Sequence, residues 1–370
     1  MLEKLTLSRR SFAKVLGAGA AITALPPMAF HANAQTSPSR GPARLHFNEN
    51  PHGPSPSARR ALERVSEVAW QYPGEMRDAL IAALSKLHGV EADHILLGNG
   101  SSEILHTAGT ALVSRERGVL VADPTYEALE QYAASVGSPA TKIPLTRSWA
   151  HDTTAMLRST RPHGVTYICN PNNPTASITP KAAVREVILK TRPETVVIAD
   201  EAYAEYVTAP EYESVVPMVA RHPNLLVLRT FSKIYGLAGL RIGYGIAQPA
   251  LLARIRARQA RNTLNAAALS AALASLGDHE WIEESRSRNA TVRGHAITEL
   301  ARLGFTTIPS HANFFMVDVG REIRPLADAM RSQGVAVGRP FPPLTTHLRV
   351  TIGTDPQMER FLELFREIAA

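Results

Sequence analysis

A lysine flanked by hydroxyl groups is the feature of this chain most able to do chemistry. Thr230 and Ser232 precede Lys233, and Arg241 follows it by eight residues. A lysine amine attacks an aldehyde only when it is unprotonated, which burial or a neighbouring positive charge favours. Hydroxyl donors and a permanent guanidinium charge suit a phosphate group. The segment therefore predicts a nucleophilic amine beside a phosphate site, although an isolated Ser-Lys pair usually belongs to an exposed loop.

A glycine turn near residue 100 predicts a second set of phosphate ligands. Gly100, Ser101 and Ser102 follow an apolar run and open an expected helix. The first backbone N–H groups of a helix have no partner inside the helix and can cradle a phosphate. Such a turn is weak evidence when it stands alone.

Two charged residues in apolar runs call for partners of opposite charge. Asp200 ends the run 195–199, and a buried carboxylate without a cation is costly. Arg349 lies inside the run 348–352, where its planar guanidinium could bind a carboxylate through two hydrogen bonds. The alternatives are a surface position for Asp200 and an internal ion pair for Arg349.

The single cysteine, Cys169, rules out an internal disulfide and any metal cluster built from cysteines. It lies in the apolar run 165–169, which predicts a buried strand position. We therefore expect neither a catalytic cysteine nor a metal site.

Short apolar runs alternate with helical patterns in the first two thirds of the chain. This alternation predicts a mostly parallel sheet covered by helices on both faces, with ligands bound in the loops that follow its strands. The expected strands are 94–97, 118–122, 165–169, 195–199, 225–228 and 241–246, and the expected helices are 101–114, 125–137 and 179–192. The first two helices would open with Ser101 and Thr125.

The pattern changes after residue 249, and 370 residues exceed what one core usually holds. We expect an α/β protein whose large domain, residues 71–262, is joined by a smaller α+β domain made of residues 44–70 and 263–370. The elements expected in the second part are helices at 250–276, 280–303 and 355–368 and strands at 313–318 and 347–352. The active site would lie between the two domains.

The N-terminus resembles a twin-arginine export signal. Arg9 and Arg10 precede a weakly apolar stretch at 15–25 and an Ala-x-Ala site that ends at Ala34. The stretch is too short to span a bilayer. We expect the export machinery to recognise residues 1–34, cleavage after Ala34, a linker at 35–43 and a periplasmic location. If the arginine pair is a chance occurrence, the protein stays in the cytoplasm.

The net charge of +7 does not indicate nucleic-acid binding. Lys4, Arg9, Arg10 and Lys14 against Glu3 give the first 34 residues +3, which leaves +4 for the rest. The remaining basic residues are scattered among acids, without a basic run. Small anionic ligands suit this mild excess better.

The segment around Lys233 resembles the lysine signature of class I/II aminotransferases, the fold type I pyridoxal-phosphate enzymes. Other matches occur in the family's order over residues 44–370. The resemblance implies pyridoxal 5′-phosphate as cofactor, carried as a Schiff base on Lys233, which then moves a proton between Cα and C4′ during transamination. The cofactor phosphate would bind Gly100, Ser101, Ser102, Thr230, Ser232 and Arg241.

The resemblance also implies how the pyridine ring would be held. Tyr126 would stack on the ring, and Asp200 would pair with the ring nitrogen. Asn173 and Tyr203 would bind the 3′ oxygen, with Asn173 also close to the substrate. Ala176 replaces the glycine that usually follows the Asn-Pro-Thr motif, which could alter the turn.

Within the family, the segments 47–54, 71–74 and 312–314 most resemble histidinol-phosphate aminotransferases. The likeness implies a homodimer in which Tyr72 reaches the cofactor phosphate of the neighbouring subunit. Arg349 would bind the substrate's α-carboxylate. Arg339 resembles an arginine that contacts a distal anionic group, or it is a surface charge.

The predicted reaction moves an amino group between an amino acid, or an amine like histidinol phosphate, and a 2-oxo acid. Since histidine biosynthesis is cytoplasmic, an exported relative is not expected to serve that pathway. The alternatives are elimination, decarboxylation or oxidation by the same fold type, and a non-catalytic binding protein.

Overall fold

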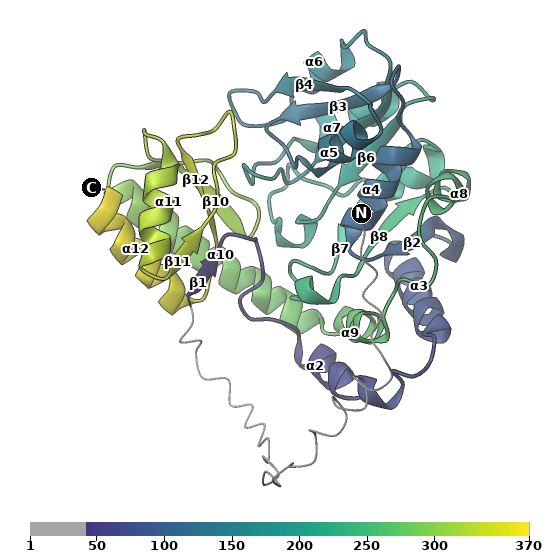
Figure 1. Ribbon diagram of the computed structural model, residues 1–370, viewed down its shortest axis with the longest axis horizontal. Coiled ribbons are helices and arrows are strands. Elements are labelled where there is room, and N and C mark those ends of the chain that lie inside the picture. The colour runs from purple at the N-terminus through teal and green to yellow at the C-terminus, as the bar shows by residue number, and fades with distance from the viewer. Residues whose placement is uncertain (1–41, 370) are drawn as a thin grey trace, which may run out of the picture. The chain divides into compact units, whose positions relative to one another are not determined.

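The computed structural model describes residues 42–369, so the predicted signal peptide at 1–34 lies outside the described residues, as does most of the linker. A seven-stranded sheet forms the centre of the larger part, in the order β2-β8-β7-β6-β5-β3-β4 (Figure 1). All neighbours from β4 to β7 are parallel, and β8 is antiparallel to β7 and β2. The predicted mostly parallel sheet is confirmed. Its strands are β2 (Ile95–Gly98), β3 (Gly118–Asp123), β4 (Ala140–Pro144), β5 (His163–Cys169), β6 (Val196–Asp200), β7 (Leu225–Thr230) and β8 (Gly243–Ala247).

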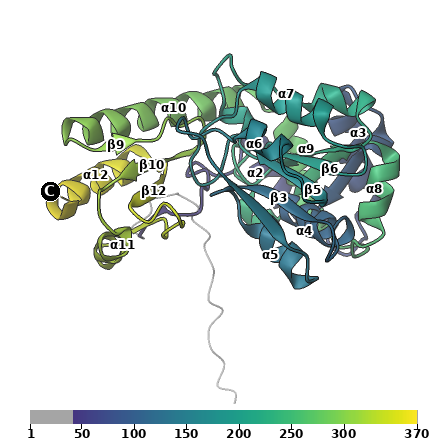
Figure 2. The ribbon, with the colours of Figure 1, turned by 90° about the horizontal axis from the view of Figure 1, so that it is seen from above.

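Helices cover both faces of this sheet because its strands are apolar on both sides. Along β6, Val197 points into one buried cluster and Ile198 into the other, as the period of two in a strand requires. The first cluster includes side chains of α2 (Pro56–Glu63), α3 (Gly74–His88), α6 (Thr153–Leu157), α7 (Lys181–Lys190) and α9 (Ala266–Leu276). The second includes α4 (Ser101–Ala111), α5 (Ala128–Ser135) and α8 (Pro249–Arg256). Figure 2 shows α7 and α5 on opposite sides of the sheet.

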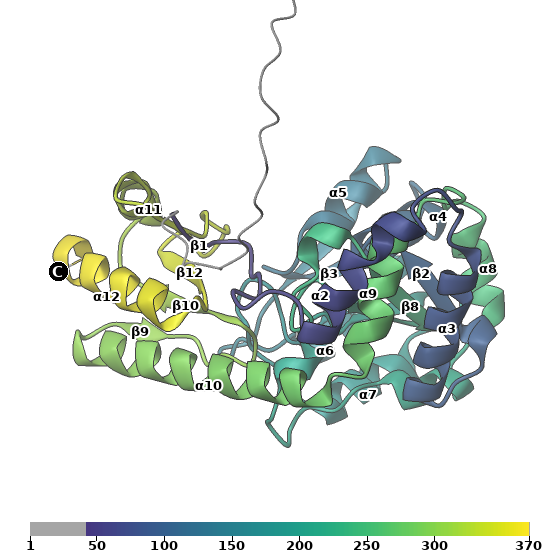
Figure 3. The same cartoon turned by 90° about the horizontal axis from the view of Figure 1, so that it is seen from below.

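The smaller part combines two short sheets with three helices around its own apolar core. Its antiparallel sheet has the order β12-β10-β9, and a parallel pair joins β1 to β11. Phe315, Val350 and Phe361 are fully buried in this core. Figure 3 shows α10 and α12 side by side. The elements are β1 (Ala43–Leu45), β9 (Thr306–Thr307), β10 (Phe314–Asp318), β11 (Val335–Val337), β12 (His347–Thr351), α10 (His279–Arg302), α11 (Ile323–Ser332) and α12 (Asp355–Ala369).

The prediction of a single helix at 250–276 is wrong, because the structure has two helices in this region, α8 and α9. α8 ends at Arg256, and the segment that follows contains Asn262 in the left-handed conformation at φ 57°, which a continuous helix does not allow. Asn265 then begins a new one, since its side chain accepts a hydrogen bond from the Ala268 amide at 2.7 Å. The break places residues 257–265 in a loop.

The helix expected from residue 125 begins instead at Ala128. The Thr125 hydroxyl does not cap it, because it donates to the Asn172 Oδ1 atom at 2.7 Å.

Short 3-10 turns complete the structure at Val65–Glu67, Ala92–His94, Ala204–Tyr206, Val216–Arg221 and Ala238–Leu240.

Helices α2 and α9 pack against each other and against the core of the large sheet. The predicted domain limits at 70 and 262 stay predictions. Within residues 42–369, no helix is long and apolar enough to cross a membrane.

Candidate active site

A cavity of about 640 Å³ lies at the carboxyl ends of β3, β5, β6 and β7, where parallel strands direct their following loops to one edge. Segments 46–49 and 331–349 complete its wall. The structure thus brings together predicted residues that are up to 248 positions apart in the sequence, from Ser101 to Arg349. Those that line it are Ser101, Ser102, Tyr126, Asn173, Asp200, Tyr203, Thr230, Ser232, Lys233, Arg241, Arg339 and Arg349.

Lys233 lies in the loop after β7 with its amine in this cavity. Its Nζ donates to the carbonyl oxygens of Phe47 at 3.3 Å and Asn48 at 3.1 Å, and lies 5.4 Å from the centre of the Tyr203 ring. Burial, followed by the positive charge of Arg349, lowers the pKa of Lys233 to about 8. At pH 7 roughly a tenth of such amines are unprotonated, far more than for a free lysine. The predicted nucleophile is therefore chemically reasonable here.

Several hydrogen-bond donors gather at the start of α4. Gly100 (φ 74°) precedes Ser101, the first helical residue, and the first N–H groups of a helix lack helical partners. A Cβ atom on Gly100 would lie only 2.3 Å from Arg241 Nη2, so a larger residue would displace the guanidinium, and the positive φ also favours glycine. Arg241 Nη1 also lies 3.4 Å from the Ser232 hydroxyl and forms no ion pair within the described chain. These residues fit a phosphate group.

Asp200, at the end of β6, is a buried carboxylate without a cation. Its side chain is 5% exposed and accepts hydrogen bonds from the Tyr167 hydroxyl at 2.8 Å and the Ala202 amide at 3.1 Å. Burial raises the pKa of Asp200, while these two hydrogen bonds oppose the rise. Among residues 42–369, no lysine or arginine lies within ion-pair distance of it. A protonated ring nitrogen would supply the missing charge, so Asp200 fits a pyridine cofactor.

Arg349, on β12, also lacks an acidic partner in the part of the chain that the structure describes. Its Nη1 donates to Asn173 Oδ1 and its Nη2 to the His46 carbonyl oxygen, each at 2.7 Å. Its Nε is buried without a hydrogen-bond partner. Burial lowers the pKa of Arg349 to about 10. The structure therefore offers no internal ion pair, and the guanidinium is available to an incoming carboxylate.

Arg339 lines the same cavity, but its charge is already paired. Its Nη2 donates to Glu127 Oε1 at 2.5 Å, and both side chains are about half exposed. The ring of Phe341 lies 4.3 Å from the Arg339 guanidinium and 4.4 Å from that of Arg349. One aromatic side chain therefore contacts both arginines.

Tyr126, Asn173 and Tyr203, the residues predicted to hold a pyridine ring, line the same cavity. Burial raises the pKa of both Tyr126 and Tyr203, so both phenols keep their protons. Ala176 adopts the left-handed conformation at φ 60°, where the family usually has glycine. The turn is thus retained, with the Ala176 amide donating to the Asn172 carbonyl oxygen at 2.7 Å.

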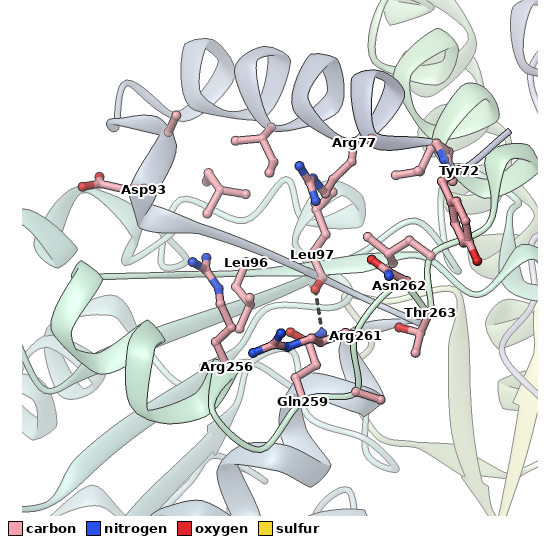
Figure 4. A pocket seen from close by; sticks show the side chains of 18 of the residues that line it. Tyr72, Arg77, Asp93, Leu96, Leu97, Arg256, Gln259, Arg261, Asn262 and Thr263 are labelled. Atoms are coloured by element: carbon pink, nitrogen blue, oxygen red, sulfur yellow. Dashed lines mark hydrogen bonds between the residues drawn. The ribbon is translucent and has the colours of Figure 1, made fainter.

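Tyr72 and Gly100 do not line the Lys233 cavity. Gly100 lies just behind it, against Arg241. Tyr72 is 88% exposed and borders a different cavity of about 960 Å³, which Figure 4 shows with Arg77 and Arg261. Within its own chain, Tyr72 therefore has no contact with the amine.

Several cavity residues were not predicted from their positions in the sequence. Tyr167 does not line the cavity itself but donates to Asp200, which does; it lies within an apolar run, where only its hydroxyl distinguishes it from a core residue. His46, Asn48, Glu49, Glu127 and Phe341 reach the site through the fold. Cys169 lines the cavity, and burial raises its pKa well above the ordinary value, which leaves an unreactive thiol. No cluster of three or more potential metal ligands occurs in residues 42–369.

Comparison with known proteins identifies a family over the same range. Residues 42–365 match the family described as aminotransferase class I and II. A histidinol-phosphate aminotransferase of Moorella thermoacetica is 38% identical over 331 residues, covering 88% of this chain and 85% of that protein. Histidinol-phosphate aminotransferase 2 of Ralstonia nicotianae is 41% identical over 317 residues, 84% of each chain. The structure of the Sinorhizobium meliloti histidinol-phosphate aminotransferase in complex with pyridoxal-5′-phosphate aligns with a TM-score of 0.83 and 25% identity, covering 94% of this chain and 99% of that one.

Proposed function

Since this chain belongs to the class I and II aminotransferase family and is a pyridoxal-phosphate-dependent aminotransferase, we propose that Lys233 is the amine that bonds to the cofactor's aldehyde. The supporting observation is that one cavity holds this amine, with its pKa lowered to about 8, beside the unpaired charges of Asp200 and Arg349. When bound, pyridoxal phosphate supplies an electron-accepting ring that stabilises negative charge on a substrate carbon that has lost its proton.

The donors at the start of α4 would hold the cofactor phosphate, with Arg241 neutralising much of its charge. Asp200 would pair with the ring nitrogen and Tyr126 would stack on the ring, a contact that contributes on the order of 1 kcal/mol. Asn173 and Tyr203 would hold the 3′ oxygen. The phosphate ligands are Gly100, Ser101, Ser102, Thr230, Ser232 and Arg241.

Lys233 would also move the proton that transamination requires. An amine whose pKa is about 8 can both accept and release a proton near neutral pH. Its Nζ would take the proton from the substrate's Cα and deliver it to C4′ of the cofactor. Arg349 would hold the carboxylate that an amino acid and a 2-oxo acid share, which places Cα within reach of Lys233.

Supplying amino donors to the cofactor-loaded protein without a 2-oxo acid tests this function. We expect stoichiometric conversion to the aminated cofactor and no further turnover. Sustained release of ammonia or carbon dioxide would instead support another fold type I activity. Lys233→Ala should abolish the conversion, and Lys190→Ala, which removes an exposed amine paired with Glu186, should leave it unchanged.

We propose that the amino donor is an amino acid or an amine like histidinol phosphate, as the names of the relatives suggest. Arg339 would bind a distal anionic group on such a donor. With a panel of donors, Arg339→Gln should raise KM only for those that carry a distal carboxylate or phosphate. An equal effect on donors without that group would leave Arg339 as a surface charge.

We propose that the enzyme is a homodimer in which Tyr72 completes the partner's phosphate site. Tyr72 is 88% exposed and Trp70 is 80% exposed, and exposed aromatic patches commonly mark protein interfaces. Mixing inactive Tyr72→Ala and Lys233→Ala subunits tests the idea. If Tyr72 acts across the interface, hybrid dimers regain one intact site, and about a quarter of wild-type activity should return. No recovery would show that Tyr72 acts within its own chain or not at all.

We also propose that the twin-arginine signal at residues 1–34 directs export to the periplasm. Arg9, Arg10 and the Ala-x-Ala site at Ala34 support this proposal. Replacing both arginines with lysine should retain the protein in the cytoplasm. Normal export of that variant would refute the assignment.

A further inference from the structure

We propose that Asn48 is a positioning residue that turns the Tyr203 hydroxyl proton into the cavity, towards the 3′ oxygen of the cofactor. The inference rests on the proposed function, because it assigns a direction to one of the hydrogen bonds that would hold the ring. It concerns three side chains, Thr351, Asn48 and Tyr203, which we call the Asn48 relay.

Hydrogen bonds connect the relay in a single sequence. The backbone N–H of Asn48 donates to Thr351 Oγ1 at 2.9 Å, and the Thr351 hydroxyl donates to the side-chain oxygen of Asn48, Oδ1, at 3.1 Å. Asn48 Nδ2 then donates to the Tyr203 hydroxyl oxygen at 3.1 Å. Asn48 is only 1% exposed, so water does not compete for these bonds.

The direction of the relay follows from which groups can only donate. A backbone N–H can only donate, so the Thr351 oxygen accepts from it. Thr351 is 1% exposed, and in the described chain the one acceptor recorded for its hydroxyl proton is the side chain of Asn48. The atom of Asn48 that faces Thr351 is therefore the oxygen, which leaves the NH₂ group facing Tyr203. Since Tyr203 accepts there, its own proton must point elsewhere.

The cavity is where that proton can go. Tyr203 lines it, and the structure records no acceptor for the Tyr203 proton among the residues it describes. Burial raises the pKa of Tyr203, so the phenol stays protonated and remains a donor. The relay thus presents an unused donor at the wall where Asn173 and Asp200 also lie.

The backbone of Asn48 ties the same residue to the reactive lysine. Its carbonyl oxygen accepts from Lys233 Nζ at 3.1 Å and from Asn313 Nδ2 at 3.0 Å. Asn48 has φ 55°, a left-handed conformation that asparagine tolerates better than most residues. Thr351 lies two residues after Arg349 on β12, so both side chains leave the same face of the strand. Asn48 therefore connects the lysine, the ring-binding tyrosine and the strand of the substrate-binding arginine.

Substituting Asn48 by aspartate tests the direction of the relay. Asn48→Asp keeps the shape of the side chain and tolerates the left-handed backbone. Its carboxylate, however, accepts a hydrogen bond from the Tyr203 hydroxyl, so the hydroxyl proton no longer points into the cavity. Losing one hydrogen bond to the cofactor should raise the dissociation constant of pyridoxal phosphate by about tenfold. A 3′ oxygen without its donor is more basic, so the pH midpoint of the visible absorption band should rise by about one unit.

Thr351 and Tyr203 supply the controls. Thr351→Ser keeps the hydroxyl and should bind the cofactor like the wild type, whereas Thr351→Val should change both readouts in the same direction as Asn48→Asp. In a Tyr203→Phe background, Asn48→Asp should add nothing, because the residue through which it acts has lost its hydroxyl. Asn48→Gly, which suits the left-handed backbone and has no charge, separates loss of the donor from the effect of a new carboxylate.

The outcomes distinguish this inference from the proposed function. If the wild-type protein forms no visible band with pyridoxal phosphate, the proposed function fails. If it does, an unchanged dissociation constant and midpoint in Asn48→Asp and Thr351→Val overturn the relay. Shifts of equal size with and without the Tyr203 hydroxyl also overturn it, because they would show a general structural effect. Circular dichroism of each cofactor-free variant shows whether it is folded, and Thr351→Ser against Thr351→Val decides the question if the Asn48 variants do not fold.

Discussion

Replacing Lys233 with methionine should stabilise the cofactor-free protein at neutral pH. Burial and the charge of Arg349 lower the pKa of Lys233 from 10.5 to about 8. Between these two pH values the unfolded chain binds a proton that the folded chain does not. Lys233 therefore makes the free energy of unfolding rise with pH between pH 8 and 10.5. Below pH 8 the buried amine is protonated in both states and lowers the free energy of unfolding by a constant amount. Methionine keeps most of the stem and removes the charge.

The size of the effect follows from the shift. A change from 10.5 to about 8 corresponds to about 3.4 kcal/mol at 1.36 kcal/mol per pKa unit. The variant also loses the hydrogen bonds from Nζ to the carbonyl oxygens of Phe47 and Asn48, and an unpaired carbonyl costs part of that gain. We expect Lys233→Met to increase the free energy of unfolding by about 1–3 kcal/mol at pH 7, and by less than about 1 kcal/mol at pH 10.

Urea unfolding of the cofactor-free proteins at both pH values measures this difference. Lys190→Met is the matched control, since that amine is exposed and pairs only with Glu186 one helical turn away. The control should change the free energy of unfolding by less than about 0.5 kcal/mol. A Lys233→Met variant that is no more stable than the wild type at pH 7, or equally stabilised at both pH values, would refute the reasoning.

Three further substitutions test the other parts of the site. Asp200→Asn keeps the shape of the side chain but removes the charge that would face the ring nitrogen. The rate of the donor half-reaction, followed by stopped-flow absorbance, should fall by a factor on the order of 10²–10³. A rate within a factor of three of wild type would contradict this role of Asp200. Arg349→Lys replaces a guanidinium that can donate two parallel hydrogen bonds to a carboxylate by a single ammonium group. Steady-state kinetics should therefore show KM for both substrates at least about tenfold higher, whereas titration should show unchanged cofactor affinity. Gly100→Ala would place a Cβ atom 2.3 Å from Arg241 Nη2, at a residue whose φ is positive. The dissociation constant of the cofactor, measured by fluorescence titration, should therefore rise at least about tenfold. An unaltered dissociation constant would show that Gly100 is not part of the phosphate site.

The residues that could be predicted from sequence are those whose local pattern already conflicts with burial. Asp200 ends an apolar strand and Arg349 lies within one, and each is buried without a partner of opposite charge in the described chain. The strands themselves were predictable because β5 and β6 are apolar on both faces. A costly charge in such a run is a local signal that does not depend on knowing the fold.

Residues that act through distant contacts could not be predicted in this way. Asn48 contacts Tyr203 and Thr351, which lie 155 and 303 residues away in sequence. Glu127 reaches Arg339 across 212 residues. No local periodicity encodes such pairs, because the backbone fold alone brings them together.

The division of the expected helix at 250–276 shows a limit of a different kind. Alanine and arginine favour helix throughout this region, yet Asn262 takes a left-handed conformation and Asn265 caps a new helix. Asparagine is only moderately unfavourable inside a helix, so packing decides whether it interrupts one. Propensity predicted the helical content here but not the loop at 257–265.

Borohydride reduction of the cofactor-loaded protein, followed by peptide mass spectrometry, tests the central claim most directly. We expect one phosphopyridoxyl group per chain, attached to Lys233, and loss of that label when an amino donor is added before the reduction. A label on any other lysine, or none on a protein that converts amino donors to 2-oxo acids, would contradict it.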